Sequence, residues 1–245
     1  MNNVKFNPTV VDNFFVNPDE IRNFGLSLSK NSSEGGHWPG QRSEELHNVD
    51  YDFNNCLILK ILSTHFDLRY TEVSWEKSNV TFQTIKSYDE DKNSLKNVGW
   101  VHQDDPNQLV GLVYLTPEAD LNSGTSIYKL KPEEEKGYLR YGANMEKRTF
   151  YQTGKIKKED YIEALEMHNN RFVETLRVQN LYNRLITYDS DHFHKANSFV
   201  TGGEDRLTLV FFVKNLKVDK YPVERTYDKQ NFDNSLTRRI NFLNE

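Results

Sequence analysis

Short runs of aliphatic and aromatic residues, separated by polar turns, recur along the second half of the chain. The two longest, at residues 109–116 and 206–213, are apolar over most of their length, which is typical of strands buried on both faces. Shorter runs, several of them alternating between apolar and polar residues, predict strands at 9–15, 70–76, 80–86, 124–128, 183–188 and 194–200. Many short strands in one chain favour a β-barrel or jelly roll.

Apolar residues at helical spacing predict helices at residues 18–29, 50–66 and 158–179. The first has Asn17 as a candidate cap, Pro18 at its first position and acidic residues in its first turn. The segment 30–42 contains glycines and a proline and predicts a loop, whereas 132–153 is polar and irregular. Helices that precede a series of strands predict a mainly β protein with flanking helices, in the α+β class.

At 245 residues, the chain fits one domain. Within residues 1–245 we expect a barrel core at about 70–215, an N-terminal helical support at 1–68 and a polar C-terminal tail at 217–245. No internal repeat or low-complexity block divides the chain.

The composition restricts the class of protein. Lys and Arg total 31 against 36 Asp and Glu, and this net charge of −5 gives no support for a nucleic-acid-binding surface. No apolar run reaches the roughly 18 residues of a membrane span, and the N-terminus lacks the features of a signal peptide. The single cysteine, Cys56, excludes an intrachain disulfide and favours a reducing compartment. We therefore expect a cytoplasmic protein without a membrane or nucleic-acid partner.

The stretch at 99–105, GWVHQDD, contains the candidate chemistry. His102 and Asp104 are two residues apart, so both side chains point to the same face of an extended backbone. Two histidines and one carboxylate, with open coordination positions, form the metal site of non-haem Fe(II) oxygenases. The third ligand is expected on a later strand, where His192 and His194 are both candidates.

Arg206 and Thr208 begin the last long apolar run and share one face of its predicted strand. A guanidinium binds a carboxylate through two parallel charge-assisted hydrogen bonds, and a neighbouring hydroxyl adds a third. This pair would suit one end of a dicarboxylate whose other end chelates a metal.

Six short motifs follow one another along residues 98–213: His102-x-Asp104, Val113-Tyr114-Leu115, Gly124-Thr125, Asn183-Arg184-Leu185, His194 and Arg206-x-Thr208. Their order resembles that of the Fe(II)- and 2-oxoglutarate-dependent dioxygenases, and most closely that of the prolyl-hydroxylase-like branch. The segment at 38–42, WPGQR, is similar to a turn found in uncharacterised bacterial and phage-type members.

The resemblance implies a double-stranded β-helix, a cupin-like jelly roll, in which His102, Asp104 and His194 bind Fe(II). It also implies O2 as a co-substrate, oxidation of a substrate by a hydroxylase, and ascorbate as an optional reductant. The metal and the co-substrates would supply the chemistry, while the protein positions and shields them.

The same resemblance implies that 2-oxoglutarate chelates the iron and is converted to succinate and CO2. Arg206 would bind the 5-carboxylate of 2-oxoglutarate, helped by Thr208 and Tyr114. The substrate is not identified by the resemblance: a small molecule and a peptide or protein side chain fit equally well.

Some features depart from the family pattern. Ser123-Gly124 stands where the family often has two glycines, and the additional His192 leaves the distal ligand open, although the spacing favours His194. The carboxylate of Asp104 argues against a halogenase, in which chloride takes that position.

Two other interpretations remain open. A cupin-like metalloenzyme that does not use 2-oxoglutarate would keep the three metal ligands and have no need of Arg206. A catalytically inactive jelly-roll binding module would need none of them. The roles of Arg42 and Trp100 also stay open: Arg42 fits a structural turn or a contact with substrate, and Trp100 fits a pocket wall or the core.

Overall fold

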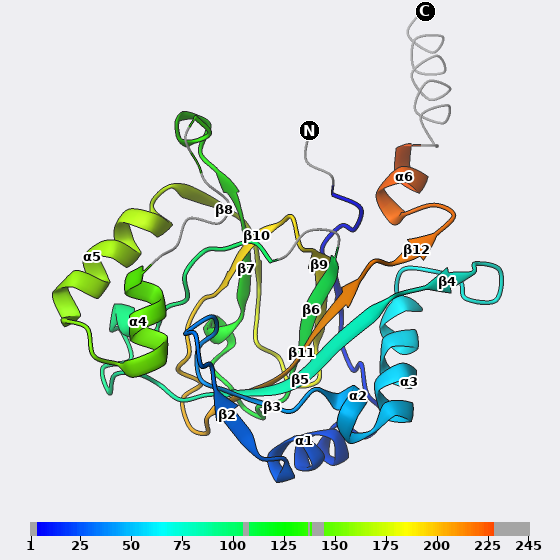
Figure 1. Ribbon diagram of the computed structural model, residues 1–245, viewed down its shortest axis with the longest axis horizontal. Helices are drawn as coiled ribbons and strands as arrows, with labels where there is room; N and C mark the ends of the chain where they lie inside the picture. Colours follow the sequence, from blue (N-terminus) through cyan, green and yellow to red (C-terminus); the bar gives the residue numbers. More distant parts are fainter. Residues whose placement is uncertain (1–3, 105–107, 137, 139–144, 228–245) are drawn as a thin grey trace, which may run out of the picture.

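The computed structural model describes residues 4–104, 108–136, 138 and 145–227 (Figure 1). Most of its strands form two antiparallel sheets. The larger sheet has the order β1 (Thr9–Val11), β9 (Leu185–Asp189), β6 (Gln108–Tyr114), β11 (Arg206–Lys214), β5 (Lys77–Ile85), β3 (Gln41–Ser43) and β2 (Lys30–Ser32). The smaller sheet has the order β10 (Phe193–Ala196), β7 (Thr125–Leu130) and β8 (Phe172–Val178).

A separate pair of two-residue strands, β4 (Val73–Ser74) and β12 (Lys217–Val218), lies beside the larger sheet (Figure 1). The α-helices are α1 (Pro18–Ser27), α2 (Leu46–Val49), α3 (Tyr51–Leu62), α4 (Met145–Thr153), α5 (Lys158–Asn169) and α6 (Pro222–Tyr227). Single 3₁₀ turns occur at Leu95–Asn97, Leu121–Ser123 and Pro132–Glu134.

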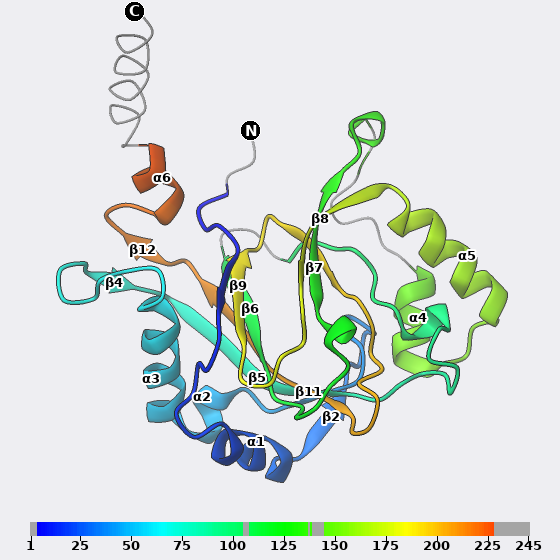
Figure 2. The same cartoon turned by 180° about the vertical axis from the view of Figure 1, so that it is seen from behind.

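Helices α1, α2 and α3 cover the outer face of the larger sheet, as Figures 1 and 2 show from opposite sides. Helix α3 begins where the Asp50 carboxylate accepts a hydrogen bond from the Phe53 backbone N–H at 2.9 Å, which satisfies one free donor of the first turn. The main hydrophobic core joins these helices to the sheet, with Ile58 and Ile61 packed near Phe82, Leu209 and other apolar residues of the strands.

The inner face of the larger sheet packs against the smaller sheet. Tyr114, Ile186 and Tyr188 come from the larger sheet, and they form one buried cluster with Ile127 and Val178 of the smaller sheet. The two sheets therefore enclose an interior, as expected of a jelly roll. A third cluster lies where helices α4 and α5 pack beside the smaller sheet (Figure 2).

The strands predicted at 109–116, 183–188 and 206–213 are confirmed within a few residues, and so are the first two helices. The helix predicted at 158–179 is partly wrong, because only Lys158–Asn169 is helical and Phe172–Val178 is strand β8. Only the two ends of β8 are buried, so its sequence lacks the alternation that marks a half-buried strand.

Two polar segments contain elements that their sequences did not predict. The segment predicted to be irregular, 132–153, ends in helix α4, whose Phe150 and Tyr151 are buried. The loop predicted at 30–42 contains strands β2 and β3, which extend the larger sheet, so the N-terminal part supplies strands as well as helical support. Part of the predicted tail, 228–245, lies outside the described residues.

Among the described residues, no helix combines the length and the apolar character that crossing a lipid bilayer requires.

Candidate metal centre

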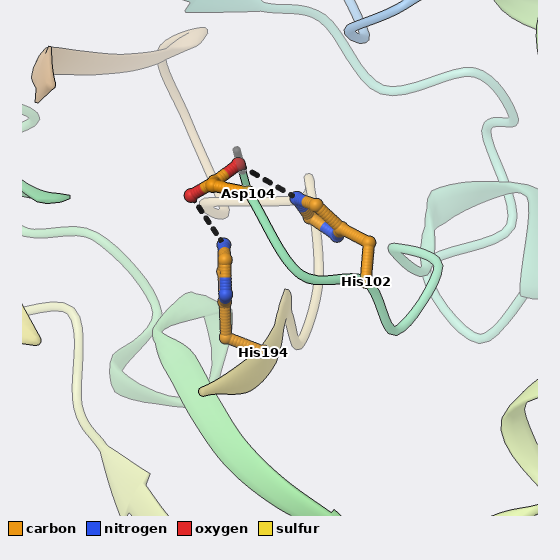
Figure 3. Close-up of side chains that lie close together, drawn as sticks. All are labelled: His102, Asp104 and His194. Atoms are coloured by element: carbon orange, nitrogen blue, oxygen red, sulfur yellow. Dashed lines mark ion pairs between the residues drawn. The ribbon is translucent and has the colours of Figure 1, made fainter. Parts of the chain in front are cut away.

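The structure brings together three side chains that are far apart in the sequence (Figure 3). Asp104 lies between two imidazoles: its Oδ2 is 3.3 Å from Nε2 of His194, and its Oδ1 is 3.8 Å from Nε2 of His102. One ligand atom from each residue lies within 4.8 Å of the others. This spacing is suited to a single metal ion bound on one face by two imidazoles and one carboxylate.

The backbone fixes this convergence. His102 and His194 form an antiparallel bridge in which each backbone N–H donates to the carbonyl of the other, at 3.0 and 2.8 Å. The Asp104 backbone N–H donates to the Ser190 carbonyl at 3.2 Å. Residues 102–104 thus run beside β10, and the extended spacing of His102 and Asp104 directs both side chains toward His194.

Hydrogen bonds also orient the two imidazoles. Nδ1 of His102 lies 2.8 Å from the Trp100 carbonyl, and Nδ1 of His194 lies 3.0 Å from the His192 carbonyl. A carbonyl oxygen only accepts, so each Nδ1 carries the proton of the neutral ring. Each Nε2 therefore keeps its lone pair, which is the arrangement that histidine ligands of metals use.

The centre is closed on one side and accessible on the other. The His194 side chain is 8 % exposed, that of Asp104 17 % and that of His102 41 %. Tyr188 packs against His194 with ring centroids 4.7 Å apart, and burial raises the pKa of its hydroxyl well above the usual value. The tyrosine ring therefore covers part of His194, the least exposed of the three side chains.

The residues predicted to bind a carboxylate lie on the inner face of the larger sheet. Arg206 and Thr208 are 2 % and 0 % exposed, and Thr208 is paired in register with Tyr114 on β6. The Tyr114 hydroxyl donates to Thr125 at 2.9 Å, and the Arg206 guanidinium lies over the Tyr114 ring, 5.6 Å from its centroid. The three predicted residues are therefore neighbours in the barrel interior.

Within the described part of the chain, Nη2 of Arg206 and Oγ1 of Thr208 are buried without a hydrogen-bond partner. Nε of Arg206 donates only a long hydrogen bond, 3.4 Å, to the Ser123 carbonyl, and no carboxylate of the described residues pairs with this arginine. Burial lowers the pKa of Arg206, which shows that the surroundings disfavour its charge. Such unpaired buried groups are costly unless a ligand completes them.

Two residues whose roles were open at the sequence level lie outside the cluster. His192 precedes β10 in a bend and is not one of the three converging side chains. Trp100 is buried in the core cluster near helices α4 and α5, where its Nε1 donates to the Tyr161 hydroxyl at 2.9 Å. Trp100 therefore packs in the core, and its carbonyl orients His102.

Other members of the motif set have structural roles. The Asn183 side chain bonds the backbone of Phe15 in both directions at 2.8 Å, and Arg184 forms an ion pair with Asp12. At Gly124, a Cβ would lie 1.8 Å from the Val178 carbonyl, so the backbones of β7 and β8 approach too closely for a side chain there. These residues hold the barrel together around the site.

The sequence analysis missed two residues close to the centre. Tyr188 could have been found, because it alternates with Ile186 on the inner face of β9. Lys147, on helix α4, was missed because its segment was assigned to irregular structure. Burial lowers the pKa of Lys147 to about 8, and the charge of Asp104 opposes this shift, so the two side chains interact electrostatically.

The sequence matches the model of one known protein family. The model of the Family of unknown function (DUF6445) matches residues 4–199, which is most of the chain. The protein belongs to this family. The three converging residues of this DUF6445 member lie inside the matched segment, whereas Arg206 and Thr208 lie beyond it. No curated protein matches the chain.

Solved structures resemble the DUF6445 member at low sequence identity. The non-heme alpha ketoglutarate dependent epimerase SnoN from nogalamycin biosynthesis is 12 % identical, with a TM-score of 0.50 over 89 % of this chain and 82 % of its own. HygX from Streptomyces hygroscopicus, solved with nickel and 2-oxoglutarate, has a TM-score of 0.49 at 12 % identity, over 86 % and 84 % of the two chains. A prolyl hydroxylase from Trichoplax adhaerens has 0.47 at 12 %, over 85 % and 83 %.

The likeness to SnoN establishes the fold. The predicted double-stranded β-helix is therefore confirmed, and the resemblance to the Fe(II)- and 2-oxoglutarate-dependent oxygenases holds at the level of the fold.

Proposed function

We propose that this DUF6445 member is an Fe(II)- and 2-oxoglutarate-dependent oxygenase that hydroxylates an organic substrate. One observation carries the proposal. Two histidines and an aspartate converge at one end of a barrel whose interior also contains an unpaired buried arginine. A metal centre alone would not require that arginine, but a dicarboxylate that chelates the metal would.

In this proposal, His102, Asp104 and His194 hold the iron. Their donor atoms, two neutral imidazole nitrogens and one carboxylate, match the preference of non-haem Fe(II) for a facial set of three ligands. The backbone carbonyls that accept from each Nδ1 fix both rings before the metal arrives, which reduces the cost of ordering them. The single carboxylate argues for hydroxylation rather than halogenation, because no ligand position is vacated for chloride.

The 2-oxoglutarate would be held by the groups that lack partners. The free Nη2 of Arg206 and the free Oγ1 of Thr208 can both donate to a carboxylate, and each gains a hydrogen bond that the protein alone does not provide. Tyr114 lines the same position, and its hydroxyl is held by Thr125. Tyr188 joins the two ends of the site, since its ring packs against His194 and it belongs to the same buried cluster as Tyr114.

Iron and 2-oxoglutarate would together supply the oxidising chemistry, with O2 consumed and succinate and CO2 released. The residues of this chain bind, orient and shield. The apolar cluster of the interior, which includes Val110, Ile127 and Ile186, keeps bulk water away from the carboxylate-binding groups. A less polar interior strengthens the pairing of Arg206 with a carboxylate.

The direct test is turnover by purified protein supplied with ferrous iron, ascorbate and labelled 2-oxoglutarate. We expect slow succinate formation even without an added substrate. In parallel, metal titration of the wild type, His102→Ala and Asp104→Ala proteins measures the affinity of the centre, which should fall at least about 100-fold in both variants because each removes a ligand.

Three results are distinguishable. Succinate formation together with metal binding that depends on His102 and Asp104 supports the oxygenase. Metal binding without any succinate or 2-oxoglutarate binding favours a cupin-like metalloenzyme that does not use 2-oxoglutarate. Equal and weak metal binding by all three proteins favours an inactive jelly-roll module.

A further inference from the structure

A second arginine, Arg42, reaches the interior from strand β3. It is paired in register with Gln83 on β5, and Gln83 is paired with Thr208 on β11, so the three side chains form one row across the inner face. Two strand spacings separate Arg42 from Thr208, a distance of roughly 10 Å. Arg42 is therefore close to the proposed 2-oxoglutarate site, and its guanidinium lies against Trp38 and Phe212.

Aromatic rings hold the Arg42 guanidinium. Its Cζ lies 4.6 Å from the centroid of Trp38 and 5.6 Å from that of Phe212, which also faces the interior. Phe212 lies four residues beyond Thr208 on β11 and is paired with Val110 on β6. Val110 is paired in turn with Tyr188, whose ring packs against His194. The guanidinium thus extends from its own row toward the metal end of the barrel.

Arg42 has little to neutralise it. Its Nη2 lies 3.5 Å from Oε1 of Gln83, its Nε is buried without a hydrogen-bond partner, and Nε1 of Trp38 is buried in the same state. In the described part of the chain, no carboxylate forms an ion pair with Arg42. Burial lowers the pKa of Arg42 to about 10, and the charge of Asp104 acts against this shift.

The formal charges of Asp104, Arg206 and Arg42 would not balance those of a bound divalent metal and 2-oxoglutarate. With a divalent metal and 2-oxoglutarate bound, the metal would be neutralised by Asp104 and one carboxylate of the co-substrate, and Arg206 by the other carboxylate. The positive charge of Arg42 would remain, and it would lose the attraction of Asp104, whose charge the metal would then share. A negative charge near Arg42 would therefore compensate the charge of this guanidinium.

Hydrogen bonds and a tight turn fix the position of the segment that contains Arg42. Gln83 donates to the Pro39 carbonyl at 2.7 Å, the Gly40 N–H donates to the Tyr88 hydroxyl at 3.0 Å, and Gln152 of helix α4 donates to the Glu34 carbonyl. Gly40 has φ +68°, and a Cβ there would lie 2.2 Å from the Thr84 carbonyl, so only glycine fits the turn. Because this segment is already ordered, it would lose less conformational entropy when a ligand binds.

We infer that Arg42, with Trp38, is a second anion-binding position of the site, and that it binds a carboxylate of the substrate. This inference rests on the proposed oxygenase function and narrows it to substrates that carry a carboxylate. The free Nε and the guanidinium edge next to it offer a carboxylate two parallel hydrogen bonds, and Nε1 of Trp38 offers another donor. An anionic group at this position would compensate the charge that Arg42 retains.

Binding to protein loaded with nickel(II) and 2-oxoglutarate tests the inference, because nickel prevents turnover. Calorimetric titration would use four N-acetyl-L-amino acids (glycine, leucine, phenylalanine and proline) and their four primary amides, which differ only in the charged group. We expect at least one acid to bind the wild type about tenfold or more tightly than its amide. Arg42→Gln should reduce this ratio to near one, and Arg42→Lys should retain part of it.

Arg177→Gln is the matched control, because Arg177 is exposed and paired with Glu174 far from the inner face. It should keep the wild-type ratio. The melting temperature of each variant reports folding, and the ratio of acid to amide affinity cancels any loss of binding that both compounds share.

The outcomes separate the two hypotheses. If the wild type fails to bind 2-oxoglutarate in the loading step, the proposed function fails and the inference fails with it. If 2-oxoglutarate binds but no acid binds better than its amide, or the preference survives in Arg42→Gln, the inference alone is wrong. Tighter binding of N-acetyl-O-phosphoserine amide than of any acid would also overturn it, in favour of a phosphate.

Discussion

The two faces of strand β11 differ in what their side chains contact. On the outer face, Leu207, Leu209 and Phe211 pack within the main core against helices α1–α3. On the inner face, Arg206 and Thr208 retain polar atoms that have no hydrogen-bond partner among the described residues. One strand of nine residues therefore contributes stabilising contacts on one side and incomplete contacts on the other.

This difference explains how the fold tolerates an incomplete interior. Burial of a large apolar side chain contributes about 1.5–3 kcal/mol, and the outer face has several such residues on β11 and its neighbours. An unsatisfied buried polar group costs about 1–3 kcal/mol. The unsatisfied groups of the inner face thus lower the stability of the unliganded protein. A ligand that formed hydrogen bonds with them would remove this penalty and bind more tightly.

The largest effect should come from the candidate metal centre at the end of the inner face. His194→Ala removes one of three donors, so we expect metal affinity and succinate formation to fall about 100-fold or more. His192→Ala is the matched control, since His192 lies two residues away but outside the cluster. Metal titration followed by a turnover assay measures both, and a larger loss in His192→Ala would reverse the assignment.

The next largest effect should be a loss of folding stability when a buried residue of the outer face is truncated. Leu209 is fully buried, so Leu209→Ala should lower the free energy of unfolding by about 2–5 kcal/mol through lost contacts and a residual cavity. Leu59→Ala provides the control, because Leu59 is 43 % exposed on helix α3 and its truncation should change stability by less than about 0.5 kcal/mol. Urea unfolding measures both, and similar values would show that the outer face is not the stabilising one.

The sequence predicted elements with many buried residues better than elements with few. The apolar runs of β6, β9 and β11 and the helical spacing of α1 and α3 are local patterns, and each was recognised. Strand β8 and helix α4 were not, because Phe172 and Val178 are the only buried residues of β8 and α4 is mostly polar. Elements with few buried residues leave a weak periodic signal.

The convergence of the three candidate metal ligands was predictable for a different reason. The His102-x-Asp104 spacing places two donors on one face of an extended chain, and the order of the later motifs pointed to His194. The environment of Arg42 was not predictable, because its place in the row with Gln83 and Thr208 depends on how β3, β5 and β11 pair. Strand register between distant segments cannot be derived from local composition.

A third effect should separate binding from stability on the inner face. Arg206→Met removes an unpaired buried charge, so we expect the apoprotein to unfold at an unchanged or higher urea concentration. The affinity for 2-oxoglutarate should fall by about 100-fold, because a buried charged pair is lost. Arg177→Met is the control: this arginine is exposed and paired with Glu174, and its loss should leave 2-oxoglutarate binding intact. An Arg206→Met protein with wild-type affinity would remove Arg206 from the site.

The smallest effect is the sharpest test, because Thr208→Val changes one hydroxyl for a methyl group. The Oγ1 atom of Thr208 is buried without a partner, so its removal should raise the free energy of unfolding of the apoprotein by about 1 kcal/mol. The same change should weaken 2-oxoglutarate binding by up to about tenfold, since one hydrogen bond to the carboxylate is lost. Opposite signs for stability and affinity are expected only of a polar group kept for a ligand. A Thr208→Val protein that loses stability as well would show that the hydroxyl supports the fold.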